Sequence, residues 1–187
     1  MSIPTLILNL QNFNKAATIL FEQSYIVPGL VILYTEIDIV ASIERRGDEG
    51  TKASFVRWCN SYLNKSPFPC TSVDLYSARC GILHGHTPES DLTRAGKARK
   101  VYYAWGTGKA ASLDEIAKHA KMSDAINIHV NDLRDAFWSG IEEWATDVRK
   151  DPTRTAKVEK RLRTWFGNLP KEIMDEALKG ILKETAK

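Results

Sequence analysis

Apolar residues along most of this chain recur every three or four positions, the spacing that places them on one face of an α-helix. The first stripe consists of Phe13, Ala16, Ala17, Leu20 and Phe21. A second helix follows Pro28, a residue suited to a first helical turn, and residues 30–43 continue it without another Gly or Pro. Apolar side chains occupy most of its circumference. We therefore expect the second helix to be the central and most buried one.

Two further helices are bounded by recognisable start and stop signals. The third carries an apolar stripe and ends before Pro67; the stripe is Phe55, Val56, Cys59, Tyr62 and Leu63. Thr71 and Asp74 have the spacing of a capping box, with Asp in place of the usual Glu or Gln. This predicts a fourth helix that opens at Thr71 or Ser72 and ends near Gly85, before Pro88.

The second half of the chain is also mainly helical in pattern. Residues 87–100 are polar and then basic, and residues 101–105 are β-branched and aromatic, which predicts either a short strand or a helical extension. The clearest amphipathic helix has its apolar positions at Val130, Leu133, Phe137, Ile141, Trp144 and Val148. A basic helix is expected from about Arg154 to Phe166, and a last one from Pro170, with Ile173, Ala177, Ile181 and Leu182. The predicted fold class is all-α, as one helical domain over residues 1–187.

Composition narrows the class of protein. The chain has 187 residues, of which 43% are hydrophobic and 26% charged, which excludes a disordered chain, a collagen-like repeat and a disulfide scaffold. Its 3 cysteines (Cys59, Cys70 and Cys80) include no CxxC pair and are expected to be reduced thiols. The N-terminus lacks a basic segment, and the apolar stretch 26–34 is too short to span a bilayer. These features predict a cytoplasmic protein with no membrane segment.

The candidate chemistry is concentrated near the end of the fourth predicted helix, which contains Arg79, His84 and His86. Arginine offers a permanent charge and forked donors that match phosphate oxygens. Histidine titrates near neutrality and can transfer protons as a general acid or base. Together these groups supply what cleavage of RNA by its own 2′-hydroxyl requires. The reaction needs neither a metal nor another cofactor.

Helical geometry leaves open which histidine acts with Arg79. At about 100° per residue, His84 lies about 140° around an ideal helix from Arg79, whereas His86 lies within about 20° of it. His84 can still reach Arg79 if the helix loosens before Gly85. Cys80 and His84 are also spaced as metal ligands would be, with His86 nearby, but no fourth ligand is evident. We expect no metal site.

The Arg79-x4-His84 spacing and the string around it, residues 75–84, resemble the RX4-6H motif of the HEPN superfamily and its uncharacterised bacterial members. The resemblance covers about residues 9–86, which leaves a C-terminal helical extension at about 112–187. It implies a helical bundle that forms a homodimer and brings two Arg–His pairs into one cleft. It also implies metal-independent endoribonuclease activity, often in toxin–antitoxin or anti-phage defence systems. An antitoxin or regulatory protein would then be a partner.

The neighbours of these residues support two other interpretations. Cys80 stands where active HEPN nucleases usually carry a polar residue, which favours an inactive module that binds RNA or a protein. Arg79 could instead form a structural ion pair with Asp38 or Glu36, and His84 could interact with the helix dipole. Tyr34 and Asp38, one turn apart on the second helix, are expected to support the site.

Two other segments suggest nucleic-acid binding. A basic run precedes the aromatic residues 102–105, as in single-strand binding surfaces; it consists of Arg94, Lys97, Arg99 and Lys100. The alternative is a solvated loop. Arg154, Lys157, Lys160, Arg161 and Arg163 form a second basic patch, interpreted as a solvated helix face.

Residues 112–123 resemble the start of a helix-turn-helix, which makes a DNA-binding regulator over residues 112–138 a third hypothesis. Residues 101–150 carry 6 Lys+Arg and 8 Asp+Glu, a sum of −2 that disfavours a DNA-reading surface. Lys121 also stands where such turns usually require Gly.

Overall fold

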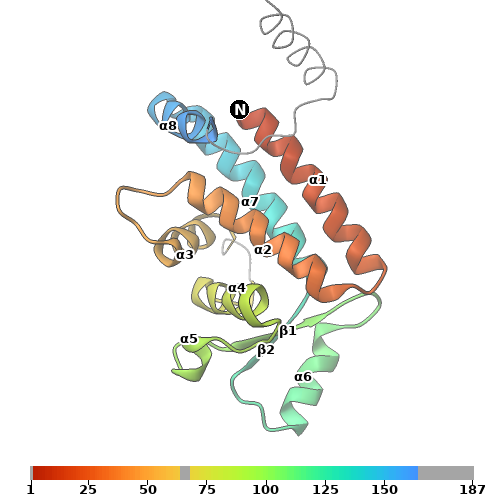
Figure 1. Cartoon of the computed structure of the whole chain (residues 1–187). Coiled ribbons are helices and arrows are strands. Elements are labelled where there is room, and N and C mark those ends of the chain that lie inside the picture. Colours follow the sequence, from red (N-terminus) through yellow and green to blue (C-terminus); the bar gives the residue numbers. More distant parts are fainter. Residues whose placement is uncertain (1, 64–67, 164–187) are drawn as a thin grey trace, which may run out of the picture.

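The computed structural model describes residues 2–63 and 68–163, which form eight helices and two short strands (Figure 1). The mostly helical fold class predicted from the sequence is confirmed. The elements in chain order are α1 (Ile3–Glu22), α2 (Ile26–Ile43), α3 (Thr51–Tyr62), α4 (Ser72–Gly85), α5 (Asp91–Arg94), β1 (Lys100–Ala104), α6 (Ala110–His119), β2 (Ala125–His129), α7 (Val130–Lys150) and α8 (Pro152–Leu162).

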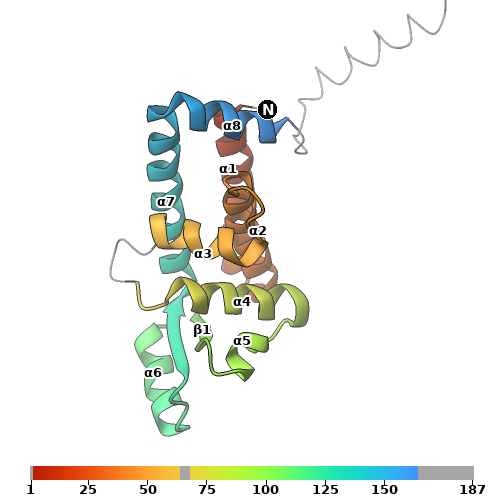
Figure 2. The same cartoon turned by 90° about the vertical axis from the view of Figure 1, so that its left-hand side faces the viewer.

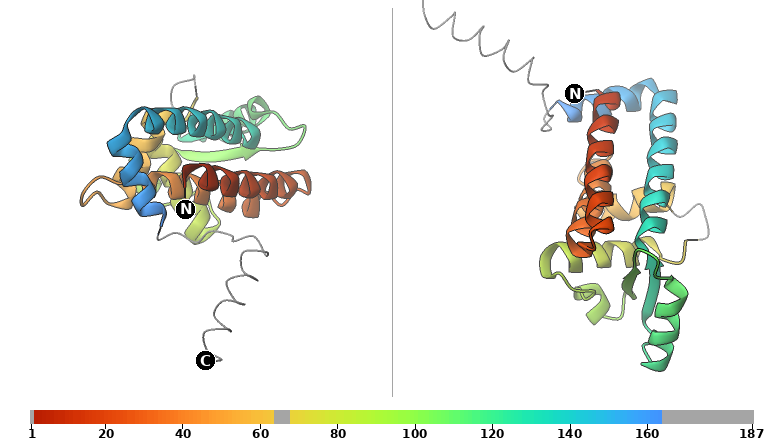
Figure 3. Two further views of the ribbon diagram at one scale, coloured as in Figure 1. Left: turned by 90° about the horizontal axis from the view of Figure 1, so that it is seen from above. Right: turned by 90° about the vertical axis from the view of Figure 1, so that its right-hand side faces the viewer.

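The long helices α1, α2 and α7 lie side by side, α3 and α4 cross them, and α8 crosses the end at which α1 begins (Figures 1 and 2). As predicted, α2 is the central helix, and Leu33, Ile37 and Val40 are fully buried in it. Viewed from above, α7 lies alongside α1 (Figure 3). Trp58 of α3 packs against Phe137 of α7, with ring centroids 5.8 Å apart. A single buried cluster therefore joins the N-terminal helices to α7 and α8.

The predicted helix signals explain most boundaries. The capping box of α4 is present: the Thr71 side chain accepts from the backbone N–H of Asp74, and the Asp74 carboxylate accepts from that of Thr71. The helix α8 begins one residue after its cap, Asp151, with Pro152 in its first turn. Residues 164–166 of the expected basic helix, and the whole helix expected from Pro170, lie outside the described residues.

The β1–α6–β2 unit projects from the lower end of the helices (Figure 1). The two strands are parallel, with Lys100 opposite Ala125 and Ala104 opposite His129. Of the two alternatives predicted for residues 101–105, the strand is confirmed, one residue earlier, whereas β2 was not predicted. This strand corrects the helix-turn-helix hypothesis, since residues 112–138 contain β2 between α6 and α7 and not a short turn. Lys121, which stands where a helix-turn-helix usually requires Gly, adopts a left-handed φ of 55°.

Among the described residues, one helix is long and apolar enough to cross a membrane by length and composition, namely α2. Half of its 18-residue window is buried inside the protein, as in the core helix of a soluble domain. The helix also contains two carboxyl groups, those of Glu36 and Asp38. This feature is weak evidence for a membrane span.

Candidate functional site

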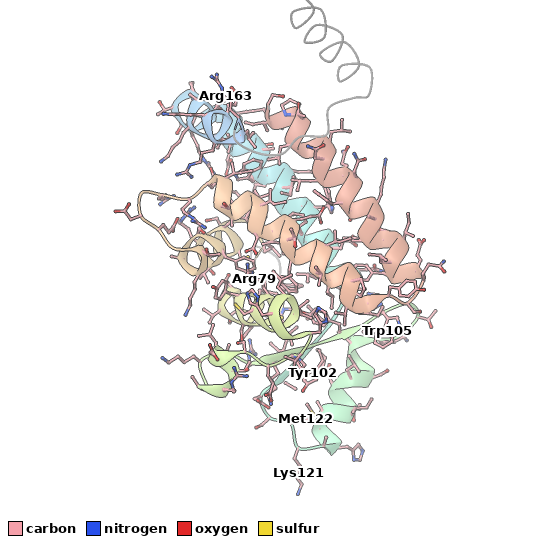
Figure 4. All side chains as sticks on the ribbon, in the orientation of Figure 1. Arg79, Tyr102, Trp105, Lys121, Met122 and Arg163 are labelled. Carbon is pink, nitrogen blue, oxygen red and sulfur yellow. The ribbon has the colours of Figure 1, made fainter. Side chains whose placement is uncertain are left out.

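The centre of the candidate site is an ion pair between neighbouring helices. Arg79 points from α4 toward α2 (Figure 4), where Oδ2 of Asp38 accepts from its Nε at 2.7 Å and from its Nη2 at 2.5 Å. The two side chains are only 15% and 19% exposed. Of the two carboxylates proposed as partners for Arg79, the structure thus places Asp38 in contact. The pair fixes the plane of the guanidinium group, because both donors converge on one oxygen.

His84 is the histidine that meets Arg79. Its Nε2 lies 3.3 Å from Nη1 of Arg79, and its side chain is at the exposed edge of α4. The long arginine side chain spans the offset that an ideal helix places between these positions. His86 lies beyond the helix end as its C-cap, with a left-handed φ of 51°. The shared face expected for Arg79 and His86 is therefore lost, because the helix ends at Gly85 and the backbone changes direction.

Burial and charge act against each other at Asp38. Burial raises the pKa of its carboxyl, and the hydrogen bond and charge of Arg79 oppose that rise, with smaller contributions from Arg45 and His84. Arg45 was not predicted as a site residue. Its position seven residues after Asp38, near the same side of α2, is the sequence signal that would have indicated it. The site therefore contains one partly desolvated carboxylate facing two arginines and a histidine.

The other expected supporting residues are placed differently. Cys80 Sγ lies 4.0 Å from Nη1 of Arg79, a distant contact to a weak acceptor. Tyr34 is fully buried, and its hydroxyl pairs with that of Tyr103 at 2.5 Å. It therefore joins α2 to β1 and does not contact Arg79 or His84, because its place on α2 faces the strand.

Glu36, the other acid on α2, is fully buried and has no hydrogen-bond partner among the described residues. Burial raises its pKa to about 8. Since this carboxyl group is not in contact with Arg79, it belongs to the core and not to the candidate site.

Three of the four cations expected to bind RNA already have carboxylate partners. Arg99 pairs with the buried Asp74 at 2.6 Å, and Lys100 pairs with Glu89 at 2.9 Å. Arg94 forms an exposed pair with Asp91. Lys97 is exposed and makes no such pair within residues 2–63 and 68–163. Most of the basic run is therefore paired with carboxylates between α4 and β1, and Lys97 is its cation without such a pair among the described residues.

The arrangement at Arg79 can hold and neutralise an anionic oxygen and exchange a proton with a neighbouring group. Nη1 of Arg79 points toward the exposed imidazole, while the other donors are held by Asp38. No group of three or more metal-ligating side chains occurs in the described part of the chain. Comparisons with family models, with curated proteins and with solved structures find no match to this chain.

Proposed function

We propose that this protein is a metal-independent endoribonuclease of the HEPN type. The observation that carries the proposal is the 3.3 Å approach of His84 Nε2 to Nη1 of Arg79, whose guanidinium is held in place by Asp38. A phosphate at the open side of this pair would meet a permanent charge and a proton-transfer group together. Such a pairing suits phosphoryl transfer better than it suits a buried structural contact.

In the proposed reaction, His84 removes the proton from a ribose 2′-hydroxyl. The 2′-oxygen then attacks the adjacent phosphorus, and Arg79 stabilises the charge that builds on the phosphate oxygens. The bond to the 5′-oxygen breaks, and this leaving oxygen receives a proton from a second acid. His86, or His84 of a second copy, is the candidate for that acid. The products are a 2′,3′-cyclic phosphate and a 5′-hydroxyl.

The test is incubation of the purified protein with mixed single-stranded RNA in EDTA. We expect cleavage that leaves cyclic-phosphate ends, and loss of about 100-fold or more in rate for His84→Ala. His119→Ala is the matched control, since His119 is exposed on the distant helix α6. Equal cleavage by wild type and His84→Ala would remove His84 from the mechanism.

A second candidate function is an inactive module that binds RNA. It is favoured by the contacts of Arg79, whose Nε and Nη2 are already engaged by Asp38, and by Cys80 beside it. Salt-sensitive RNA binding without cleavage in the same assay would support this candidate. Homodimer formation and an antitoxin partner stay proposals that follow from the HEPN resemblance. Light scattering of the purified chain tests the first of them.

A further inference from the structure

A cavity of about 240 Å³ lies between the carboxyl end of α2 and the helix α8. Its wall is dominated by charged side chains, four of them basic and two acidic: Arg46, Arg154, Lys157, Arg161, Glu44 and Asp151. The cavity is at the end of the bundle where α8 crosses α2, far from the β1–α6–β2 unit (Figure 1). Its charge thus belongs to a different surface from the basic run before β1.

Two of the basic residues build the wall. Arg154 donates from Nε and Nη2 to the two carboxylate oxygens of Glu44, each at 2.6 Å, and from Nη2 to the hydroxyl of Tyr62 at 2.7 Å. Arg161 donates from Nη1 to the backbone carbonyl of Ile43 at 2.9 Å. These contacts join α8 to the end of α2. The charge of Glu44 is thereby neutralised within the wall.

The other acid is also engaged. The Asp151 side chain accepts from the backbone N–H groups of Thr153 and Arg154 and so caps α8. By contrast, Arg46 and Lys157 are exposed, and neither side chain donates a hydrogen bond or forms an ion pair in the described part of the chain. The cavity therefore presents positive charge whose hydrogen-bond donors are available to an incoming anion.

The cavity lies on the same helix as the candidate cleavage site. Asp38 lies on α2 and Glu44 is the C-cap of that helix, six residues later, which is about 9 Å along the helix axis. Arg45 directly follows Glu44 in the chain, and its charge reaches Asp38. A stacked single strand advances about 3.4 Å per nucleotide, so this span corresponds to about three nucleotides.

We propose that the α2–α8 cavity binds a backbone phosphate of single-stranded RNA a few nucleotides from the bond held at Arg79. Arg46 and Lys157 contact the phosphate, and Arg154 and Arg161 shape the wall behind it. Binding would release counterions from the strand, which makes the affinity dependent on salt. This inference rests on the proposed function, because the strand that it binds is the one cleaved at Arg79.

The experiment measures the fluorescence anisotropy of a labelled single-stranded RNA oligonucleotide in EDTA. The full chain carries His84→Ala, so that the RNA is not cleaved. The double variant Arg46→Ala/Lys157→Ala is compared with a second double variant, the α6 variant, which combines Lys118→Ala on α6 with Lys121→Ala in the turn after it. Both remove two exposed charges, and Lys121 lies at the opposite end of the molecule (Figure 4). We expect the cavity variant to lose roughly tenfold or more in affinity at about 50 mM salt, with a salt slope smaller by about 1.4. The α6 variant should bind as its parent does.

Equal losses in the two variants would overturn the site, since net charge alone would then explain the binding. No loss in either variant would overturn it as well. A thermal melt with inorganic phosphate, against chloride at equal ionic strength, distinguishes a free-phosphate site from an RNA site. If phosphate stabilises the parent protein but not the cavity variant, and the cavity variant binds RNA as tightly as its parent, the cavity is a free-phosphate site and not an RNA site.

Cleavage separates this inference from the proposed function. With His84 intact, we expect the cavity variant to have an increased KM on a ten-nucleotide RNA and an unchanged kcat, and to cleave a dinucleotide normally. Site-dependent RNA binding with no cleavage by any protein would reject the nuclease and keep the cavity. Cleavage unaffected by the cavity variant on both substrates would reject the cavity and keep the nuclease.

Discussion

Asp38 accepts two hydrogen bonds from Arg79 through a single oxygen, Oδ2, whereas its Oδ1 is buried with no partner among the described residues. Asp38 on α2 therefore holds the guanidinium of Arg79, which extends from α4, in one orientation. Because both side chains are less than one-fifth exposed, water screens the pair only in part. Asp38 is accordingly a positioning residue for Arg79.

The first prediction concerns the coupling of this pair. Asp38→Asn and Arg79→Met should each lower the free energy of unfolding, and the double variant should lose less than the sum of the two. We expect a coupling of about 1–3 kcal/mol in a double-mutant cycle followed by urea denaturation. If Asp38 positions Arg79, Asp38→Asn should also decrease kcat and be rescued poorly by added substrate. Additive losses would show that the two side chains do not stabilise each other.

The second prediction separates structural from ligand-binding cations. Arg99 donates to the buried Asp74 through its backbone N–H, Nε and Nη2, and the hydrogen bonds that Asp74 accepts outweigh burial and lower its pKa. Arg99→Ala should therefore cost about 2 kcal/mol of stability, measured by urea denaturation at pH 7. A depressed acid pKa stabilises the fold above the unfolded pKa, so this cost should shrink as the pH falls through the folded pKa. Lys97→Ala, the control, should change stability little.

The third prediction concerns pH and Glu36. Its pKa rises from 4.5 to about 8 in the folded protein, so the protonated form is favoured by folding. Because folding favours the protonated carboxyl, Glu36 does not reduce the free energy of unfolding below pH 4.5. It reduces that free energy progressively as the pH rises from 4.5 to about 8. Glu36→Gln should thus gain about 3 kcal/mol at pH 7 and nothing at pH 4. Glu142→Gln on the exposed face of α7 is the control, and an equal gain from both variants would contradict the assignment.

The fourth prediction concerns the turn that follows α4. A Cβ on Gly81 would meet the backbone oxygens of Thr87 and Glu89, the latter at 2.8 Å, so residues 87–89 pack directly on the helix. Gly81→Ala should cost about 1–3 kcal/mol and reduce cleavage, because the displaced turn carries His86 and follows His84. Gly50→Ala has open space around its Cβ and serves as the control in thermal melts. Equal melting temperatures for the two variants would show that this packing is not needed.

The sequence by itself determined the longer helices of this protein, but not α5, which lies in a segment expected to be a polar loop. Hydrophobic spacing is a local property, and it predicted α2 as the buried centre, the long amphipathic α7 and the capped start of α4. It also placed Arg79, His84 and His86 at the end of one helix, because these residues are neighbours in the chain. Residues 101–105 predicted either a strand or a helical extension where β1 lies, and β2 carried too short a pattern next to the strong signal of α7.

Tertiary structure decided which of these neighbours meet. The choice of Asp38 over Glu36 depends on how α2 is turned against α4, and that orientation comes from packing of the whole core. The loss of His86 from the face of Arg79 follows from the left-handed residue that ends α4. Pairing of Arg99 with Asp74, and the cavity built by α2 and α8, join residues 25 and 110 positions apart. Such contacts leave no periodic trace in the sequence, because they arise only when distant helices are brought together.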